Sequence, residues 1–136
     1  MPIIYTIDVR RALIVTRCFG HVTLAEVQEH FEELARVWPA VDKLDVLLDL
    51  TEQTSLPTLR DLEEVATEID AQIGPRQFGR CAVVTDQDLL SGSMQMWEVL
   101  VGRFFDAIEI FRTPSAALAW LMPRPKRKAS RTLTTQ

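Results

Sequence analysis

The chain is poor in the residues that cross-link a protein or bind metals: its 136 residues include two cysteines, two histidines and five glycines. Cys18 and Cys81 each lie in an apolar run, without Cys-x-x-Cys or histidine spacing, so we expect buried free thiols rather than a disulfide or a zinc site. The sequence contains no glycine-rich phosphate loop and no dinucleotide-binding fingerprint. We therefore expect no metal and no cofactor.

Long apolar runs are also missing. No stretch approaches the roughly 20 apolar residues that a membrane-spanning helix needs. The start, MPIIYTIDVRR, has no basic region followed by an apolar stretch and a cleavage site, so we predict a cytoplasmic protein without a secretion signal. With 47% hydrophobic and 25% charged residues, the chain is expected to form one globular domain with its own core.

Positive charge is scarce except at the C-terminus. The formal net charge is −4, but residues 123–136 hold five basic residues and no acid, which leaves residues 1–122 at −9. Because phosphate contacts need positive charge, we expect no nucleic-acid binding by this acidic body. The composition of residues 123–136 predicts a disordered tail. Two interpretations of it stay open: a solvated extension, and a weak contact with nucleic acid or anionic lipid through residues 124–131.

Strand and helix patterns alternate along the domain. The runs IIYTIDV and ALIVTRCF, separated by Arg10 and Arg11, predict an N-terminal hairpin. Further strands are predicted over 44–50, 80–86 and 107–111, and helices over 21–38, 59–73, 90–104 and 113–121. This order favours an α/β fold with a mostly parallel five-stranded sheet and right-handed crossovers.

The expected helix starts carry hydroxyl and carboxylate side chains. Thr23 and Glu26 have the spacing of a capping box, in which side chain and backbone groups pair reciprocally. Thr58 and Asp61 repeat that spacing before the second helix. The other caps expected are Thr113 for the last helix, and Asp88 and Ser91 for the third.

Several segments together resemble a known family. The hairpin, the strand end LLDLT, the segment CAVVTDQDLLSGSMQMW and the ending IEIFRTPSAALAWL resemble the small bacterial STAS-type domains of the SpoIIAA-like family, relatives of the anti-sigma-factor antagonists. The resemblance spans about residues 3–122. It implies a small STAS-like (β/α) superhelix with an N-terminal hairpin and four helices. It also implies a non-enzymatic signalling role, either in phosphorylation-switched protein binding or in the sensing of small ligands.

One position bears on the phosphorylation switch. The Asp-Leu-Ser strand end of the antagonists is matched by Asp49, Leu50 and Thr51, but Pro-Thr-Leu-Arg at 57–60 replaces their Asp-Ser-Ser-Gly turn. Thr58 thus keeps a hydroxyl at the phosphoacceptor position, without the preceding acid or the following glycine. Both roles stay open for Thr58, and helix capping is favoured.

Polar side chains are expected where the parallel strands end. Ligands of such sheets bind outside the carboxyl ends of the strands. The binding rim predicted there consists of Thr51, Thr54, Ser55, Thr58, Asp86, Asp88, Ser91 and Ser93. His21 lies nearby in sequence, but no Gly-x-Ser-x-Gly motif supports a hydrolytic triad, so we predict no catalytic residue. Carboxylates spaced as Asp86 and Asp88 are common in loops, and we predict no metal site there.

The third helix carries large apolar side chains on more than one face. Met94 and Trp97 belong to the expected buried stripe, whereas Met96 lies about 100° from Trp97 around the helix. Two interpretations stay open: a broad core face, and an apolar contact in which Met94 and Trp97 line a ligand cleft or a homodimer interface. His30, among glutamates on the first helix, is predicted to be solvated.

The sequence thus predicts a non-enzymatic STAS-like module for protein interaction or small-ligand sensing, with its partner and ligand unknown. Three alternatives remain. The first is a carrier of apolar ligands or lipids, and the second is an anti-sigma-factor antagonist switched by phosphorylation. The third is an enzyme that uses the acidic rim.

Overall fold

The computed structural model describes residues 2–74 and 76–122, so the tail predicted over 123–136 lies outside the described residues. Its sheet has five strands in the order β1-β2-β3-β4-β5. These are β1 (Ile3–Asp8), β2 (Leu13–Gly20), β3 (Lys43–Gln53), β4 (Gln77–Val84) and β5 (Ala107–Phe111). The hairpin pair β1 and β2 is antiparallel, and every other pair is parallel. The predicted fold class is therefore confirmed.

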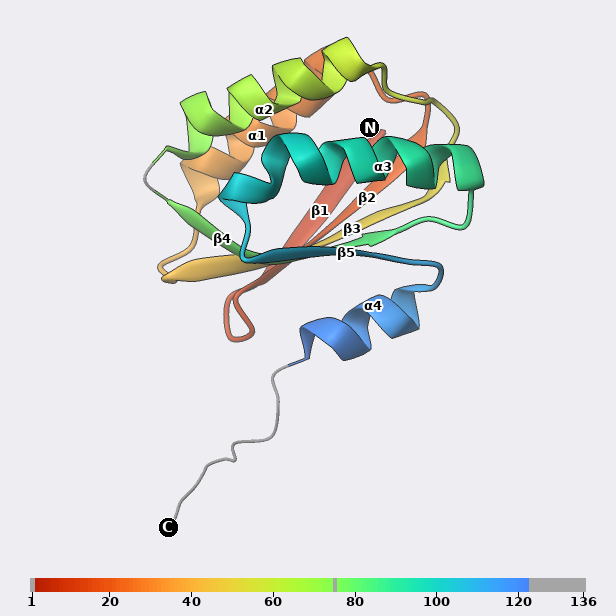
Figure 1. Cartoon of the computed structure of the whole chain (residues 1–136). Coiled ribbons are helices and arrows are strands. Elements are labelled where there is room, and N and C mark those ends of the chain that lie inside the picture. The colour runs from red at the N-terminus through yellow and green to blue at the C-terminus, as the bar shows by residue number, and fades with distance from the viewer. Residues whose placement is uncertain (1, 75, 123–136) are drawn as a thin grey trace.

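Helices cover both faces of the sheet (Figure 1). On one face lie α1 (Leu24–Val37), α2 (Leu59–Ile73) and α3 (Asp88–Val101), the last followed by a short 3-10 turn at Gly102–Phe104. The fourth helix, α4 (Pro114–Leu121), lies alone on the opposite face. We call these the three-helix face and the α4 face. No helix within the described residues is long and apolar enough to cross a membrane.

Two strands differ from their predicted bounds. β3 was expected over 44–50 but spans Lys43–Gln53, and β4 was expected over 80–86 but spans Gln77–Val84. In both cases polar residues extend the strand through backbone pairing, since Gly20 pairs with Gln53 and Lys43 with Gln77. The apolar runs mark only the buried centre of each strand.

The helix caps follow the sequence with one exception. The capping boxes Thr23–Glu26 and Thr58–Asp61 both form, and the Thr113 hydroxyl accepts a hydrogen bond at the start of α4. The caps predicted for α3 are wrong. Asp88 and Ser91 lie inside the first turn of α3, because Gln87 is the N-cap residue. Its backbone N–H donates to the hydroxyl of Thr85, 3.2 Å away.

Side chains of the α4 face form a small, closed core. Its buried members are Leu13, Leu47, Ala82, Val84, Ala117 and Leu121. Ala82 and Ala117 are both fully buried. These two alanines let α4 approach the sheet closely, and the larger side chains of Leu13, Leu47 and Leu121 fill the space around them.

Arg80 of β4 fixes the end of α4. Its guanidinium donates to the carbonyls of Trp120 and Leu121, each at 2.8 Å, and lies over the Trp120 ring. Asp45 on β3 accepts from the backbone N–H of Arg80 at 2.8 Å. Gly79 precedes this contact, and a Cβ there would collide with the Asp45 carboxylate, so a larger residue would have to displace that carboxylate from Arg80.

Candidate ligand cavity

A cavity of about 370 Å³ lies between the sheet and the helices of the three-helix face. We call it the helix-face cavity. An engineered apolar cavity of about 150 Å³ already binds benzene, and ligand pockets measure about 300–1,000 Å³. The helix-face cavity therefore falls in the size range of small-molecule sites.

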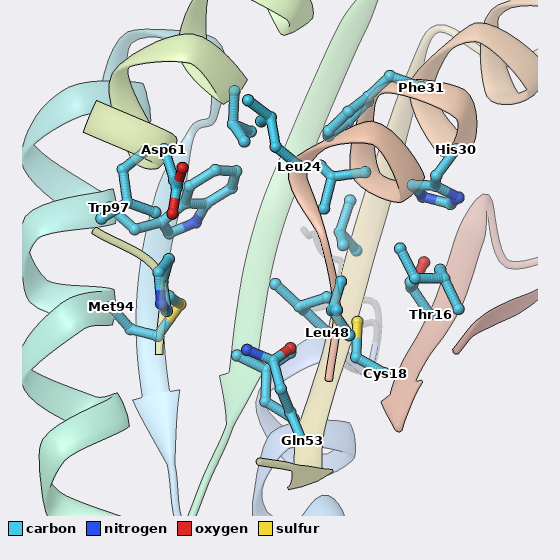
Figure 2. A pocket seen from close by; sticks show the side chains of 18 of the residues that line it. Thr16, Cys18, Leu24, His30, Phe31, Leu48, Gln53, Asp61, Met94 and Trp97 are labelled. Atoms are coloured by element: carbon cyan, nitrogen blue, oxygen red, sulfur yellow. The ribbon is translucent and has the colours of Figure 1, made fainter. Parts of the chain in front are cut away.

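The wall of the cavity is mostly apolar and draws on every layer around it (Figure 2). Alternate residues of β2 and β3 point into it, because side chains of a strand alternate between the two faces. From these strands come Ile14, Thr16, Cys18, Val46, Leu48 and Leu50, and from the helices Leu24, Phe31, Leu62, Val65, Met94 and Trp97.

The mouth of the cavity lies at the carboxyl edge of the sheet. Three of the described lining residues are exposed, namely His21, Thr23 and Leu56. They belong to the loop from β2 to α1 and the loop from β3 to α2. Ser55 ties these loops together, since its hydroxyl accepts from the backbone N–H of Val22 at 3.0 Å. Solvent thus reaches the cavity where ligands of parallel sheets bind.

The predicted binding rim is divided by the structure. Of its eight residues, Ser55 alone lines the cavity; both apolar contact residues, Met94 and Trp97, line it as well. The other seven predicted rim residues do not line the cavity; they are Thr51, Thr54, Thr58, Asp86, Asp88, Ser91 and Ser93.

Local contacts explain part of that division. The Thr51 hydroxyl donates to the Asp49 carboxylate at 2.7 Å, and the Ser93 hydroxyl donates to the carbonyl of Leu89 at 3.4 Å. Thr58 caps α2, and Asp88 lies next to Arg112 on the surface. Short polar side chains near strand and helix ends mostly satisfy neighbouring groups, and these four do so.

The imagined hydrolytic triad does not assemble. His21 lies at the cavity mouth, whereas Asp86, Ser91 and Ser93 are outside the cavity wall. No hydrogen bond joins His21 to any of them within the described part of the chain. The same residues contain no cluster of three His, Cys, Asp or Glu side chains suited to a metal ion.

His30 was predicted to be solvated, and this is wrong. Its ring lines the cavity and meets the Tyr5 ring edge-on, with 5.3 Å between centroids. Burial lowers the pKa of His30 to about 4, against a smaller opposite effect of the Glu33 carboxylate. The neighbouring glutamates suggested a solvated side chain, but β1 packs beside α1 and covers the ring. His30 is thus a neutral part of the wall near pH 7.

The two cysteines are buried free thiols, as predicted. Both line the cavity, which the sequence did not indicate. Burial raises the pKa of Cys18 and of Cys81 to about 12. Both thiols are therefore protonated near pH 7, which makes them poor nucleophiles.

One polar residue of the wall, Thr16 of β2, lies at a strand position that the sequence pattern marks as inward-facing. Ile14, Thr16 and Cys18 alternate along the strand, so all three share its inward face. Thr16 is nonetheless 3% exposed and lines the cavity. The cavity itself leaves no such signal, because an apolar wall and a filled core have the same residue pattern.

A mostly parallel five-stranded sheet with an N-terminal hairpin and helices on both faces defines a STAS-type fold. The chain belongs to the SpoIIAA-like family, whose sequence model it matches over residues 13–122. Among curated proteins, none matches the chain.

One solved structure extends the comparison. It is an uncharacterised protein of the DUF3478 family with a SpoIIAA-like fold, from Shewanella loihica PV-4. The TM-score is 0.64 with 17% sequence identity, over 88% of this chain and 94% of that one. At this identity the likeness shows the fold alone.

Proposed function

We propose that this chain is a SpoIIAA-like module that binds a small apolar molecule in the helix-face cavity, as a sensor or a carrier. One observation carries the proposal: a cavity of about 370 Å³, mostly apolar, with a mouth at the carboxyl edge of the sheet. Its size and position are those of small-ligand sites in α/β proteins.

The energy available for binding comes from the wall. Apolar surface gains roughly 25 cal/mol per Å² when it leaves water, and an unfilled apolar cavity lacks the dispersion contacts that a ligand would restore. Leu48, on the central strand β3, is only half-buried because it faces this space.

The test is a fluorescence titration with N-phenyl-naphthylamine, an uncharged apolar dye that becomes bright in apolar sites. Wild-type protein should bind it saturably with one site per chain. Leu48→Trp places a large ring in the cavity and should abolish binding, whereas Leu118→Trp, on the outer surface of α4, should leave it unchanged. Leu48→Phe provides a smaller filler if the tryptophan variant does not fold. Equal binding by the filled and control variants would refute the proposal.

A second candidate function is protein interaction, which the outer surface of α3 favours. Leu89 and Val99 are 75% and 79% exposed, and Met96 between them is also exposed. Spacings of seven and three residues place all three on one side of the helix. Val99→Glu should reduce any dimer seen by native mass spectrometry, whereas Leu118→Glu should not. A purely monomeric wild type at high concentration would contradict the homodimer version.

A further inference from the structure

Thr16 brings a buried hydroxyl group to the wall of the helix-face cavity. It lies in the middle of β2, lines the cavity and is 3% exposed. Its hydroxyl has no hydrogen-bond partner within the described residues. Among the described side chains that are not exposed, Nε1 of Trp97 is the one N or O atom that is both unpaired and completely enclosed. The Thr16 hydroxyl is therefore not enclosed, and the open space beside it is the cavity.

His30 lies beside Thr16, because both are neighbours of Tyr5. Tyr5 pairs with Thr16 across the hairpin, and side chains paired in this way lie about 5 Å apart on one face of the sheet. The His30 ring meets the Tyr5 ring with 5.3 Å between centroids. Figure 2 shows Thr16 and His30 on one side of the cavity, with Met94 and Trp97 on the other. We call Thr16 and His30 the polar corner.

The polar corner has hydrogen-bonding capacity that the protein does not use. The ring nitrogens of His30, like the Thr16 hydroxyl, have no partner within the described residues. The nearby Tyr5 hydroxyl is engaged, since it donates to the Glu33 carboxylate at 2.9 Å. Buried polar groups in native proteins are nearly always paired with protein, water or a bound molecule. A molecule in the cavity can therefore gain hydrogen bonds at this corner.

The charges around the cavity disfavour an anionic ligand. Among the described residues that line it there is no lysine or arginine, and Asp61 is the one carboxylate. His30 is uncharged near pH 7, because burial lowers its pKa to about 4, and the Glu33 carboxylate is close enough to oppose that shift in part. An anionic group at the polar corner would lie near Glu33 with no cation in the wall to offset it, and unpaired buried charges are strongly disfavoured.

The polar corner offers both donors and acceptors. A threonine hydroxyl donates and accepts, and a neutral imidazole has one N–H donor and one acceptor nitrogen. We infer that the ligand is an uncharged molecule with an apolar body and one hydroxyl group, which hydrogen-bonds to Oγ1 of Thr16 and to a ring nitrogen of His30. A hydroxyl group suits either position of the imidazole proton, because it can donate to one partner and accept from the other. This inference rests on the proposed function and adds the chemical class of the ligand.

The experiment compares two probes that differ in one group. Para-propylphenol carries a hydroxyl group where para-propyltoluene carries a methyl group of similar size. Each displaces N-phenyl-naphthylamine from wild type and from Thr16→Val, which replaces the hydroxyl of Thr16 with a methyl group. Thr16→Val should weaken binding of the phenol about fivefold more than it weakens binding of the toluene, the net value of one hydrogen bond. Equal changes for the two probes would overturn the inference.

His30→Phe tests the second partner, because it removes both ring nitrogens and keeps an aromatic ring against Tyr5. It should also weaken binding of the phenol about fivefold more than binding of the toluene. Thr6→Val is the matched control, since Thr6 lies on the neighbouring strand β1, is exposed and does not line the cavity. This control should change the binding of neither probe. A His30→Phe variant that affects both probes equally would contradict the assignment of His30.

The protein without ligand gives an independent measurement. Thr16→Val should keep or raise the melting temperature, because it removes a hydroxyl that has no partner in the protein. A lower melting temperature would mean that the hydroxyl is already paired within the protein, which would overturn the inference. Thr16→Ser keeps the hydroxyl with a smaller side chain, and it should keep the wild-type ratio of phenol to toluene affinity.

A charged probe tests whether the ligand is uncharged. Octanoate and octanol have chains of the same length, and both compete with the dye at neutral pH. Octanoate should bind at least about tenfold more weakly than octanol, since no lysine or arginine among the described lining residues offsets the burial of its carboxylate. Octanoate as the better competitor would assign the site to an anionic ligand and overturn the inference.

The inference and the proposed function fail separately. Saturable binding of N-phenyl-naphthylamine by wild type, with equal effects of Thr16→Val on both probes, overturns the inference and leaves an apolar-ligand module whose ligand is of another class. Absence of dye binding by wild type itself contradicts the proposed function as well.

Discussion

The two faces of the sheet differ in how completely helices and strands pack together. On the α4 face, one helix of eight residues closes a small core of alanine, valine and leucine side chains, and Arg80 fixes the end of that helix. On the three-helix face, three longer helices surround a cavity of about 370 Å³. Both faces are formed by the same strands, and Leu47 and Leu48 point to opposite sides. A general inability to pack therefore does not explain the cavity, as expected if the cavity is the ligand site proposed above.

The largest difference between the faces is expected for truncation of these neighbouring leucines. Leu47 is 2% exposed in the closed core, so Leu47→Ala should cost about 2–5 kcal/mol of unfolding free energy. Leu48 already borders empty space and has fewer contacts to lose, so Leu48→Ala should cost less than about 2 kcal/mol. Urea unfolding of both variants gives the comparison. Equal losses would mean that the cavity is filled in solution by the protein's own side chains.

Acid should weaken the three-helix face through His30. Its pKa is lowered from 6.5 to about 4 in the fold, so the unfolded chain binds the proton more tightly. Stability from this group is complete above pH 6.5 and is lost as the pH falls towards 4, by about 2 kcal/mol at pH 5. His30→Gln should lose that part of the pH dependence, and His21→Gln, at the exposed mouth, should keep it. Unfolding free energies at pH 7 and pH 5 decide the matter, and identical pH profiles for wild type and His30→Gln would contradict it.

Adding a methyl group should have opposite consequences on the two faces. Val84 is fully buried in the α4-face core, and Val84→Ile should destabilise the protein by about 1–3 kcal/mol through overpacking. Val46 lines the cavity, and Val46→Ile should be neutral or stabilise by up to about 0.8 kcal/mol. Thermal unfolding measures both. A loss for Val46→Ile equal to that for Val84→Ile would show that the cavity has no room for the group.

The smallest effect concerns Thr58, the one candidate for a phosphorylation switch. Its hydroxyl accepts from the backbone N–H of Asp61 at 3.0 Å, as Thr113 does at the start of α4. If Thr58 acts only as a cap, Thr58→Ala and Thr113→Ala should each cost about 1 kcal/mol, and both should keep dye binding. A Thr58→Ala variant with unchanged stability but lost ligand or partner binding would instead favour the switch.

The sequence predicted the fold well because its signals are local. Alternating apolar runs, the capping boxes at Thr23 and Thr58, and the Thr113-Pro114 helix start each depend on a few adjacent residues. The predicted caps of α3 were wrong because the helix begins one residue after Gln87, at Asp88. Side-chain type alone does not determine which of two adjacent residues is the N-cap.

The helix-face cavity was less predictable than the fold, because its existence depends on the distance between the helices and the sheet. Met94 and Trp97 both line the cavity, but a filled core and a hollow one need the same residue types. His30 shows the same limit, since its burial comes from β1, distant in sequence. Four of the eight predicted rim residues contact groups in their own neighbourhood, and one, Ser55, lines the cavity.

The most direct measurement is a crystal structure of the protein under xenon pressure. Xenon enters apolar cavities without needing polar contacts. We expect xenon density in the helix-face cavity beside Met94 and Trp97, and none between α4 and the sheet. A helix-face cavity that contains no xenon, because side chains have closed it, would contradict the proposal that this face binds an apolar ligand.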